Sequence, residues 1–291
     1  MNRKILLLAV FALMFASSTM FAQRGVKLRF AFATDVHLHN GYPREQLKGF
    51  QKALDKIKSE KVEFIIFGGD LDDIDGLSHN REKQTAENLY AGFKKIADET
   101  GIKYYPTIGN HDRYYDKDGG YVDGDEMFKA FFGKTYYTFE NAGVRFFVIN
   151  SVQHKKDVQG YVVGDEQMEW LKKELESVPA TTPIVVSTHV PVYSMYYPVV
   201  EGKYVMVDVI ANYKELLKVF DKHNLKLVLQ GHQHLHEEML LQGVHYVTGG
   251  AVSAAWWRGN HHGTEEGYLI VEVDKKNRFS WRYVDYGWEA K

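Results

Sequence analysis

The sequence contains no cysteine, and this absence limits the chemistry that is open to the chain. Without cysteine the protein forms neither a disulfide nor a thiolate metal site, so any metal ion must bind nitrogen and oxygen ligands. A lipoprotein anchor, which is built on a cysteine, is excluded as well.

A strong excess of one charge and flexible linkers are also missing. The net charge of the 291 residues is −2, and 45% of them are hydrophobic, as in globular proteins. Such a chain has no basic surface for nucleic acid, so we expect no stable nucleic-acid partner.

No Pro/Gly/Ser-rich stretch, charge block or repeat of fixed period marks a domain boundary, although the length would allow two domains. We therefore expect residues 23–291 to form one domain.

The N-terminal apolar run, residues 5–16, is too short to cross a bilayer. It has 12 residues, whereas a membrane span needs roughly 20. Arg3 and Lys4 precede it and small residues follow, which is the pattern of a secretory signal. We expect residues 1–22 to be a signal peptide and the mature protein to be periplasmic or secreted, without a transmembrane span. An uncleaved anchor is the alternative, because cleavage after Ala22 would leave the bulky Met20 near the bond.

Runs rich in β-branched and aromatic residues alternate with segments of helical spacing. The first part of the chain reads as strand, helix, strand, helix, strand, which predicts an α/β layer with parallel strands. A hairpin is expected over 136–151 and a helix over 166–177, and short strands after residue 236 look antiparallel. The strands that matter for the site are predicted at 26–34, 62–67, 102–108, 183–187 and 225–229.

Metal-capable side chains follow each of these five strands. In open α/β sheets, ligands gather at the carboxyl ends of the strands. One such residue alone would more often be a cap or a turn residue, but five blocks in succession indicate a shared site. The blocks are Asp35-Val36-His37, Gly69-Asp70, Gly109-Asn110-His111-Asp112, Thr188-His189 and Gly231-His232-Gln233-His234.

These blocks resemble the motifs of the calcineurin-like metallophosphoesterases. That family has D-x-H, GD, GNH followed by an acid, H, and GHxH in this order, and the resemblance covers about residues 28–235. It implies a four-layer α-β-β-α sandwich of two mixed sheets, in the α/β class, with a dinuclear metal site at one edge. With the predicted signal, the chain is similar to secreted bacterial members.

The resemblance also implies the metal ligands. Hard or borderline divalent ions such as Mn, Fe or Zn bind carboxylate, imidazole and amide oxygen, and a shared carboxylate can hold two of them roughly 3.5–4 Å apart. A glycine before three of the ligands would permit tight turns there. One ion would take Asp35, His37, Asp70 and His234, and the other Asp70, Asn110, His189 and His232, with Asp70 as the bridge.

Phosphoester hydrolysis is the activity that the resemblance implies. Metal coordination can lower the pKa of water from about 15.7 to about 7, so a hydroxide bridging the ions would attack a phosphate mono- or diester in line. His111 would face the small-molecule substrate, stabilising phosphate charge or protonating the leaving oxygen, and Asp112 would orient its imidazole. The rival interpretation is an inactive scaffold of the same fold, but no ligand is missing.

The role of three acidic residues that follow Asp70 is not decided by the sequence. Asp72, Asp73 and Asp75 would bind an extra cation or, as the more ordinary interpretation, form a solvated loop. Purple acid phosphatases place a tyrosine where Asp73 stands, so a purple iron site is disfavoured.

Aromatic residues near the expected site are equally open. Some would stack on a substrate or only pack the loops, and the histidine pair at 261–262 would face substrate or solvent. The sequence favours neither mono- nor diesters and leaves the oligomeric state open. The aromatic residues concerned are Tyr114, Tyr115, Tyr193, Tyr196, Tyr197, Trp256 and Trp257.

Overall fold

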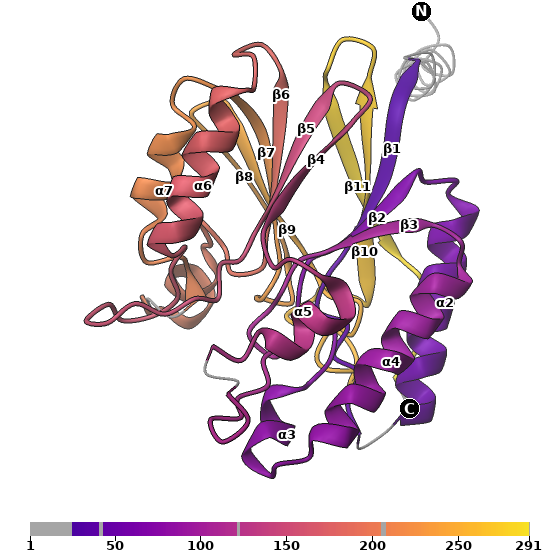
Figure 1. Ribbon diagram of the computed structural model, residues 1–291. Coiled ribbons are helices and arrows are strands. Elements are labelled where there is room, and N and C mark those ends of the chain that lie inside the picture. Colours follow the sequence, from indigo (N-terminus) through magenta and orange to yellow (C-terminus); the bar gives the residue numbers. More distant parts are fainter. Residues whose placement is uncertain (1–24, 41–42, 121–122, 205–207, 291) are drawn as a thin grey trace, which may run out of the picture.

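The computed structural model describes residues 25–40, 43–120, 123–204 and 208–290 (Figure 1). The predicted signal peptide, residues 1–22, lies outside these residues, so it stays a prediction. Within the described part of the chain, no helix combines the length and the apolar composition that crossing a membrane requires.

The first sheet has five strands and contains the predicted parallel core. Strands β1, β2 and β3 run parallel, with α2 and α4 as the connecting helices, and β10 and β11 add an antiparallel edge beside β1. This confirms the alternation of strands and helices that the sequence predicts. The bounds are β1 Val26–Ala33, α2 Pro43–Ser59, β2 Phe64–Phe67, α3 Asp75–His79, α4 Lys83–Glu99, β3 Lys103–Pro106, β10 Gly267–Asp274 and β11 Phe279–Asp285.

The second sheet has six strands in the order β4-β5-β6-β7-β9-β8. The predicted hairpin is β4 and β5, and the strand pairs β8–β9 and β10–β11 are antiparallel as expected. However, β9 lies between β8 and β7 and pairs with β7 in parallel, so the purely antiparallel C-terminal region is wrong in this respect. The bounds are α5 Glu126–Phe132, β4 Tyr137–Asn141, β5 Val144–Ile149, α6 Asp165–Glu176, β6 Pro183–Thr188, η1 Tyr196–Glu201, α7 Tyr213–Val219, β7 Asn224–Gln230, β8 His236–Leu241 and β9 Val244–Gly249.

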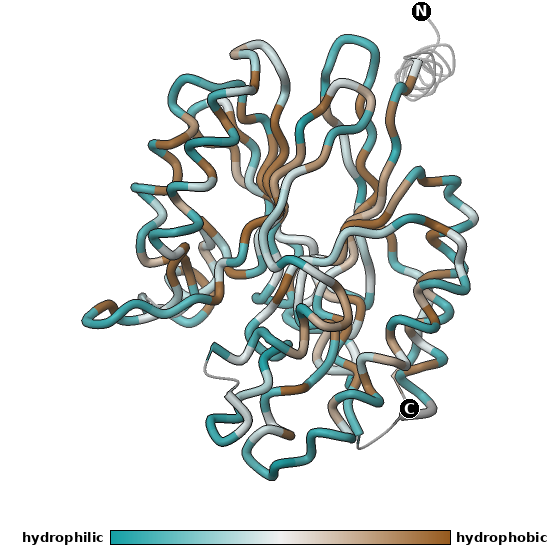
Figure 2. Tube along the Cα trace, viewed as in Figure 1, coloured by the Kyte–Doolittle hydropathy of each residue, from teal (hydrophilic) through white to brown (hydrophobic). Residues whose placement is uncertain are grey.

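The two sheets pack face to face, and helices cover their outer faces. Side chains alternate along the strands, so Phe30 and Phe64 point into a cluster between the sheets, where Phe146 meets Phe30 edge-on at 5.4 Å between ring centroids. The intervening residues face helices, with α2 and α4 against the first sheet and α6 and α7 against the second (Figure 1). Figure 2 shows the hydrophobic stretches concentrated in these strands. The arrangement confirms the four-layer α-β-β-α sandwich.

Candidate metal centre

The loops after β1 and β2 remain paired beyond the strands, and this pairing places the first ligands side by side. The strand register aligns Ala33 with Phe67. Beyond it, the Asp35 amide donates to the Gly69 carbonyl at 2.9 Å, and the His37 amide donates to the Asp70 carbonyl at 3.0 Å. In the second sheet, the Gly231 amide donates to the His189 carbonyl at 2.9 Å, which joins the loops after β6 and β7.

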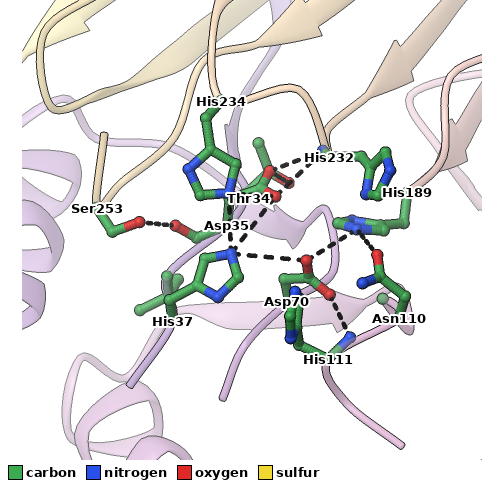
Figure 3. Close-up of polar contacts among 12 residues, drawn as sticks. Thr34, Asp35, His37, Asp70, Asn110, His111, His189, His232, His234 and Ser253 are labelled. Carbon is green, nitrogen blue, oxygen red and sulfur yellow. Dashed lines mark hydrogen bonds and ion pairs between the residues drawn. The ribbon is translucent and has the colours of Figure 1, made fainter. Parts of the chain in front are cut away.

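Five of the seven predicted ligands have a left-handed backbone. A residue other than glycine pays roughly 1–2 kcal/mol for this conformation, and such strain concentrates at functional sites. Here it turns side chains from successive loop positions toward one point (Figure 3). The φ angles are 55° for Asp35, 49° for His37, 50° for Asp70, 71° for His232 and 55° for His234.

Glycine is required beside the ligands for two different reasons. Gly69 has a φ of +99°, which matches the predicted tight turn. Gly109 has no such angle, but a Cβ atom there would lie 2.1 Å from Asp70 Oδ1. The tight-turn explanation is therefore wrong for Gly109, whose missing side chain instead makes room for the Asp70 carboxylate.

The first predicted ligand set lies in one buried cluster. Ligand atoms of Asp35, His37 and His234 all lie within 4.8 Å of one another. His234 Nε2 is 3.3 Å from Asp35 Oδ1, and His37 Nε2 is 3.6 Å from Asp70 Oδ2. The structure therefore brings together all four residues of the first set.

The second set shares Asp70 with the first. Ligand atoms of Asp70, His189 and His232 also lie within 4.8 Å of one another. His189 Nε2 is 3.1 Å from Asp70 Oδ2 and 3.1 Å from Asn110 Oδ1. Because the same Asp70 oxygen faces His37 and His189, its carboxylate lies between the two sets, as a bridging ligand must (Figure 3).

Hydrogen bonds on the outer side of three imidazoles define which nitrogen faces inward. His37 Nδ1 donates to Asp73 at 2.6 Å, and the Nδ1 atoms of His189 and His234 donate to backbone carbonyls at 2.9 and 2.5 Å. Whenever the ring is neutral, its Nε2 is therefore the unprotonated nitrogen, and this is the form that binds metal. Burial lowers the pKa of His189, but Asp70 outweighs this and raises it to about 9, so a metal ion would displace a proton there.

These inward nitrogens fit a cation better than they fit each other. His37 Nε2 and His234 Nε2 are 2.9 Å apart. In the neutral rings both are acceptors with no proton to share, whereas a cation would be bound by both nitrogens. The donor set of imidazole, carboxylate and amide oxygen suits Mn, Fe or Zn.

Charge at the centre keeps Asp70 ionised. Burial alone raises the pKa of this carboxyl, but the neighbouring His189 and His111 hold it well below its usual value. Asp70 is thus a carboxylate at neutral pH, as a ligand for two cations must be.

His111 lies at the edge of the cluster, where its side chain is 33% exposed. Burial lowers its pKa, yet the carboxylates of Asp70, Asp75 and Asp73 outweigh this and raise it to about 10. His111 Nδ1 lies 2.9 Å from Asp75 Oδ1, which leaves Nε2 as the second donor of the protonated ring.

Asp112 does not orient His111, so that prediction from the sequence is wrong. Its carboxylate accepts backbone N–H bonds from Leu71 at 2.8 Å, Asp72 at 3.2 Å and Gly109 at 2.8 Å. These donors converge on Asp112 because the loops after β2 and β3 lie against each other. Asp112 therefore fixes the loop that carries Asp70, and Asp75 holds the imidazole.

The three acids after Asp70 do not form a solvated loop. Asp73 and Asp75 bind the imidazoles of His37 and His111. Asp72 is fully buried, and burial with the nearby Asp112 and Asp73 raises its pKa well above the usual value. None of the metal-capable groups found among the described residues includes these acids, so their geometry does not indicate an extra cation. Their position just after Asp70 was the sequence signal for a supporting role.

Asp208 was not predicted from the sequence. Its Oδ1 lies 3.1 Å from His232 Nε2, which leaves the Nδ1 atom of His232 toward the cluster. Thr34 was missed as well, although it precedes Asp35 and its hydroxyl donates to Asp35 Oδ2 at 2.5 Å. Asp208 lies between β6 and α7 in a segment without a recognisable pattern, so only the fold reveals it.

A cavity of about 200 Å³ opens over this centre, and aromatic residues form part of its wall. Tyr196, Tyr197, Trp256 and His261 line it together with Asp70, His111, Asp208, His232, Gln233 and His234. The aromatic residues left open by the sequence therefore fall into two groups. Tyr196, Tyr197 and Trp256 line the cavity, where a substrate could contact them. Tyr114 is buried, Tyr193 packs on neighbouring tyrosines, and Trp257 donates its indole N–H to the backbone, so these pack the loops.

Known structures share this fold at low sequence identity. A dimetal phosphatase from Danio rerio has a TM-score of 0.65 and 14% identity, covering 90% of this chain and 97% of that one. A purple acid phosphatase from yellow lupin has a TM-score of 0.60 and 18% identity over 91% of this chain, which spans about half (52%) of the lupin enzyme. GAP50 of Plasmodium, an anchor in the inner membrane complex, has a TM-score of 0.57 and 17% identity, covering 90% and 85%.

The sequence matches none of the curated proteins with which it was compared. A comparison with protein families matches residues 28–236 to the calcineurin-like phosphoesterases. This segment is most of the chain and contains every predicted ligand. The chain therefore belongs to the calcineurin-like phosphoesterase family, whose members are hydrolases that act on phosphoester bonds.

Proposed function

We propose that the protein is an exported phosphoesterase that hydrolyses small-molecule phosphate mono- or diesters with two divalent ions of Mn, Fe or Zn. The observation that carries the proposal is the Asp70 carboxylate. It is buried and ionised, and it lies between two groups of inward-facing ligand atoms. One ion would be held by Asp35, His37, Asp70 and His234, and the other by Asp70, Asn110, His189 and His232.

The ions would polarise a phosphoryl oxygen and lower the pKa of bound water toward about 7. The chain's own contribution is to hold and orient the reacting groups. The carboxylate and imidazole ligands are fixed by bonds to Thr34, Asp73 and backbone carbonyls, so little reorganisation is needed during the reaction.

His111 supplies the proton donor. Unlike the buried ligands it is partly exposed, and it lines the cavity that a substrate would enter. With Nδ1 bonded to Asp75, protonated His111 donates from Nε2 to a phosphate oxygen or to the leaving oxygen in an in-line displacement. Asp112 supports this indirectly by fixing the loop of Asp70.

Export and the single mature domain, 23–291, belong to the proposal too. They are supported by the charged start and the 12-residue apolar run of the N-terminus. N-terminal sequencing of protein from a periplasmic fraction tests this part, and a cytoplasmic product that retains Met1 would contradict it.

The hydrolytic proposal is tested by stripping the protein with EDTA and restoring Mn, Fe or Zn. We expect two bound ions per chain by mass spectrometry of the metals. Hydrolysis of p-nitrophenyl phosphate or its bis ester should return with the second ion. Asp70→Asn should lose both ions and activity. Two bound ions without hydrolysis across a broad ester panel would instead identify an inactive scaffold.

A further inference from the structure

Exposed large hydrophobic side chains are concentrated beside the metal cavity. Nine are found among the described residues, and four of these lie between residues 195 and 204. A fifth, Trp256, lines the cavity itself. Single exposed hydrophobics are ordinary on a protein surface, but such a concentration marks a binding site. We call Met195, Val199, Val200 and Tyr204, which are 47%, 68%, 51% and 68% exposed, the η1 surface.

Tyr204 connects the η1 surface to the metal cavity through a neighbouring hollow. Tyr197, Asp208 and Gln233 line the cavity, and the same three residues line a neighbouring hollow with Pro198 and Tyr204. The hollow therefore links the cavity to Tyr204, one of the four residues of the η1 surface.

Side-chain hydrogen bonds hold the start of the η1 surface in place. At its start, Glu237 accepts hydrogen bonds from the Ser194 hydroxyl at 2.9 Å and from the Met195 amide at 2.5 Å. In η1 itself, the Tyr196 hydroxyl lies 2.8 Å from His262 Nε2, which joins it to the loop of Trp256. The start of η1 is therefore anchored to β8 and to the loop of Trp256, which reduces the ordering needed there when a ligand binds.

The charges of the cavity also limit the substrate. Among the described residues that line it, none is Lys or Arg, while Asp70 and Asp208 are acidic. A substrate with further phosphates would meet no additional cationic side chain there, whereas an apolar substituent would meet Tyr196, Tyr197 and Trp256. This composition favours one phosphate joined to an apolar group.

We infer that the substrate is an amphiphilic phosphoester whose alkyl, acyl or prenyl chain lies on the η1 surface while its phosphate is held at the metal centre. This inference rests on the proposed hydrolysis and names the substrate class. The occupant of the surface is the substrate's own chain, because Tyr204 of the surface lines a hollow whose Tyr197, Asp208 and Gln233 also line the cavity.

Two diesters with the same leaving group test the inference. In p-nitrophenyl methyl phosphate and p-nitrophenyl octyl phosphate, the oxygen of water bonds to phosphorus, p-nitrophenolate leaves and an alkyl phosphate remains. Burying a methylene group fully is equivalent to about fourfold in binding. We expect kcat/KM to be at least tenfold higher for the octyl ester, assayed below its critical micelle concentration. Burial of about two of its methylene groups is enough to give a tenfold difference.

A pair of double variants locates the effect. Val199→Ser with Val200→Ser should reduce the octyl preference below about threefold and leave the methyl ester unchanged. Leu240→Ser with Leu241→Ser is the matched control, because these residues of β8 are 60% and 42% exposed, and it should keep the preference.

Each contrary outcome has a distinct meaning. Equal kcat/KM for the two esters, or a preference that survives the η1 replacements, overturns this inference and leaves phosphoester hydrolysis intact. Failure to hydrolyse either diester while p-nitrophenyl phosphate is hydrolysed overturns this inference alone. Failure with all three esters, with two ions bound, overturns the proposed function as well. If equal kinetics accompany flotation with phosphatidylcholine vesicles that the η1 replacements abolish, the surface binds membranes and not a substrate chain.

Discussion

Replacing Asp75 tests which acid orients His111. Asp75→Ala removes the 2.9 Å contact between Asp75 Oδ1 and His111 Nδ1. A hydrogen bond to a charged group contributes about 1.5–3 kcal/mol. The side chains of Asp75 and His111 are 36% and 33% exposed, so solvent screens their interaction and the lower value applies. We therefore expect kcat to fall roughly tenfold. Metal content should not change, because neither residue belongs to the two ligand sets.

A double-mutant cycle separates orientation from other effects. His111→Ala should lower kcat by about 10²- to 10⁴-fold, the usual contribution of a general acid. If Asp75 acts through His111, adding Asp75→Ala to this variant costs nothing further. The assay is steady-state hydrolysis of bis(p-nitrophenyl) phosphate at saturating metal, with Asp118→Asn as an exposed acidic control. The reasoning would be refuted if the fold-loss of kcat in the double variant equalled the product of the two single losses. Full activity in Asp75→Ala would refute it as well.

Three further predictions concern the second ion, the pH dependence of a turn and the core. Asp208→Asn should weaken binding of the second ion by about 10- to 100-fold in calorimetry, because Asp208 supports His232, and unchanged affinity would contradict this. Asp274 bonds to Arg278 and to backbone amides, which lower its pKa to about 2. The stabilisation is complete above about pH 3.9, the unfolded pKa, and is lost as pH falls through about 2, so an NMR titration midpoint near 4 would refute it. Phe146→Ala should cost about 3–5 kcal/mol in urea unfolding, because Phe146 is buried between the sheets, and a loss below 1 kcal/mol would oppose the packing described.

The metal ligands were predictable because each follows a predicted strand. The apolar runs before Asp35, Asp70 and His189 indicate strands, and parallel strands bring their carboxyl ends to one edge. Position along the chain and residue type together were enough to identify the two sets.

The residues that hold the ligands in place were less predictable, because their role depends on the direction of side chains in irregular loops. Asp112 adjoins His111 in sequence, but the turn sends its carboxylate to the backbone amides of another loop. Asp75 instead reaches His111 from the start of α3. Asp208 becomes a neighbour of His232 only when the sheet is assembled, so no local pattern shows it.

The order of the strands β7, β9 and β8 could not be predicted from the sequence either. The short strands after residue 236 have the alternation of hairpins, and β8 and β9 do form one. That pattern does not tell which member of the hairpin lies next to β7. The inner strand is β9, whose buried Tyr246 and Val247 sit beside β7, whereas β8 exposes Leu240 and Leu241 at the edge.

The central claim is that Asp70 is shared by two metal ions. Anomalous diffraction from crystals grown with Mn²⁺ tests it most directly. We predict two anomalous peaks on either side of the Asp70 carboxylate, one against Asp35, His37 and His234 and the other against Asn110, His189 and His232. A single peak, or two peaks that do not both contact Asp70, would contradict the claim.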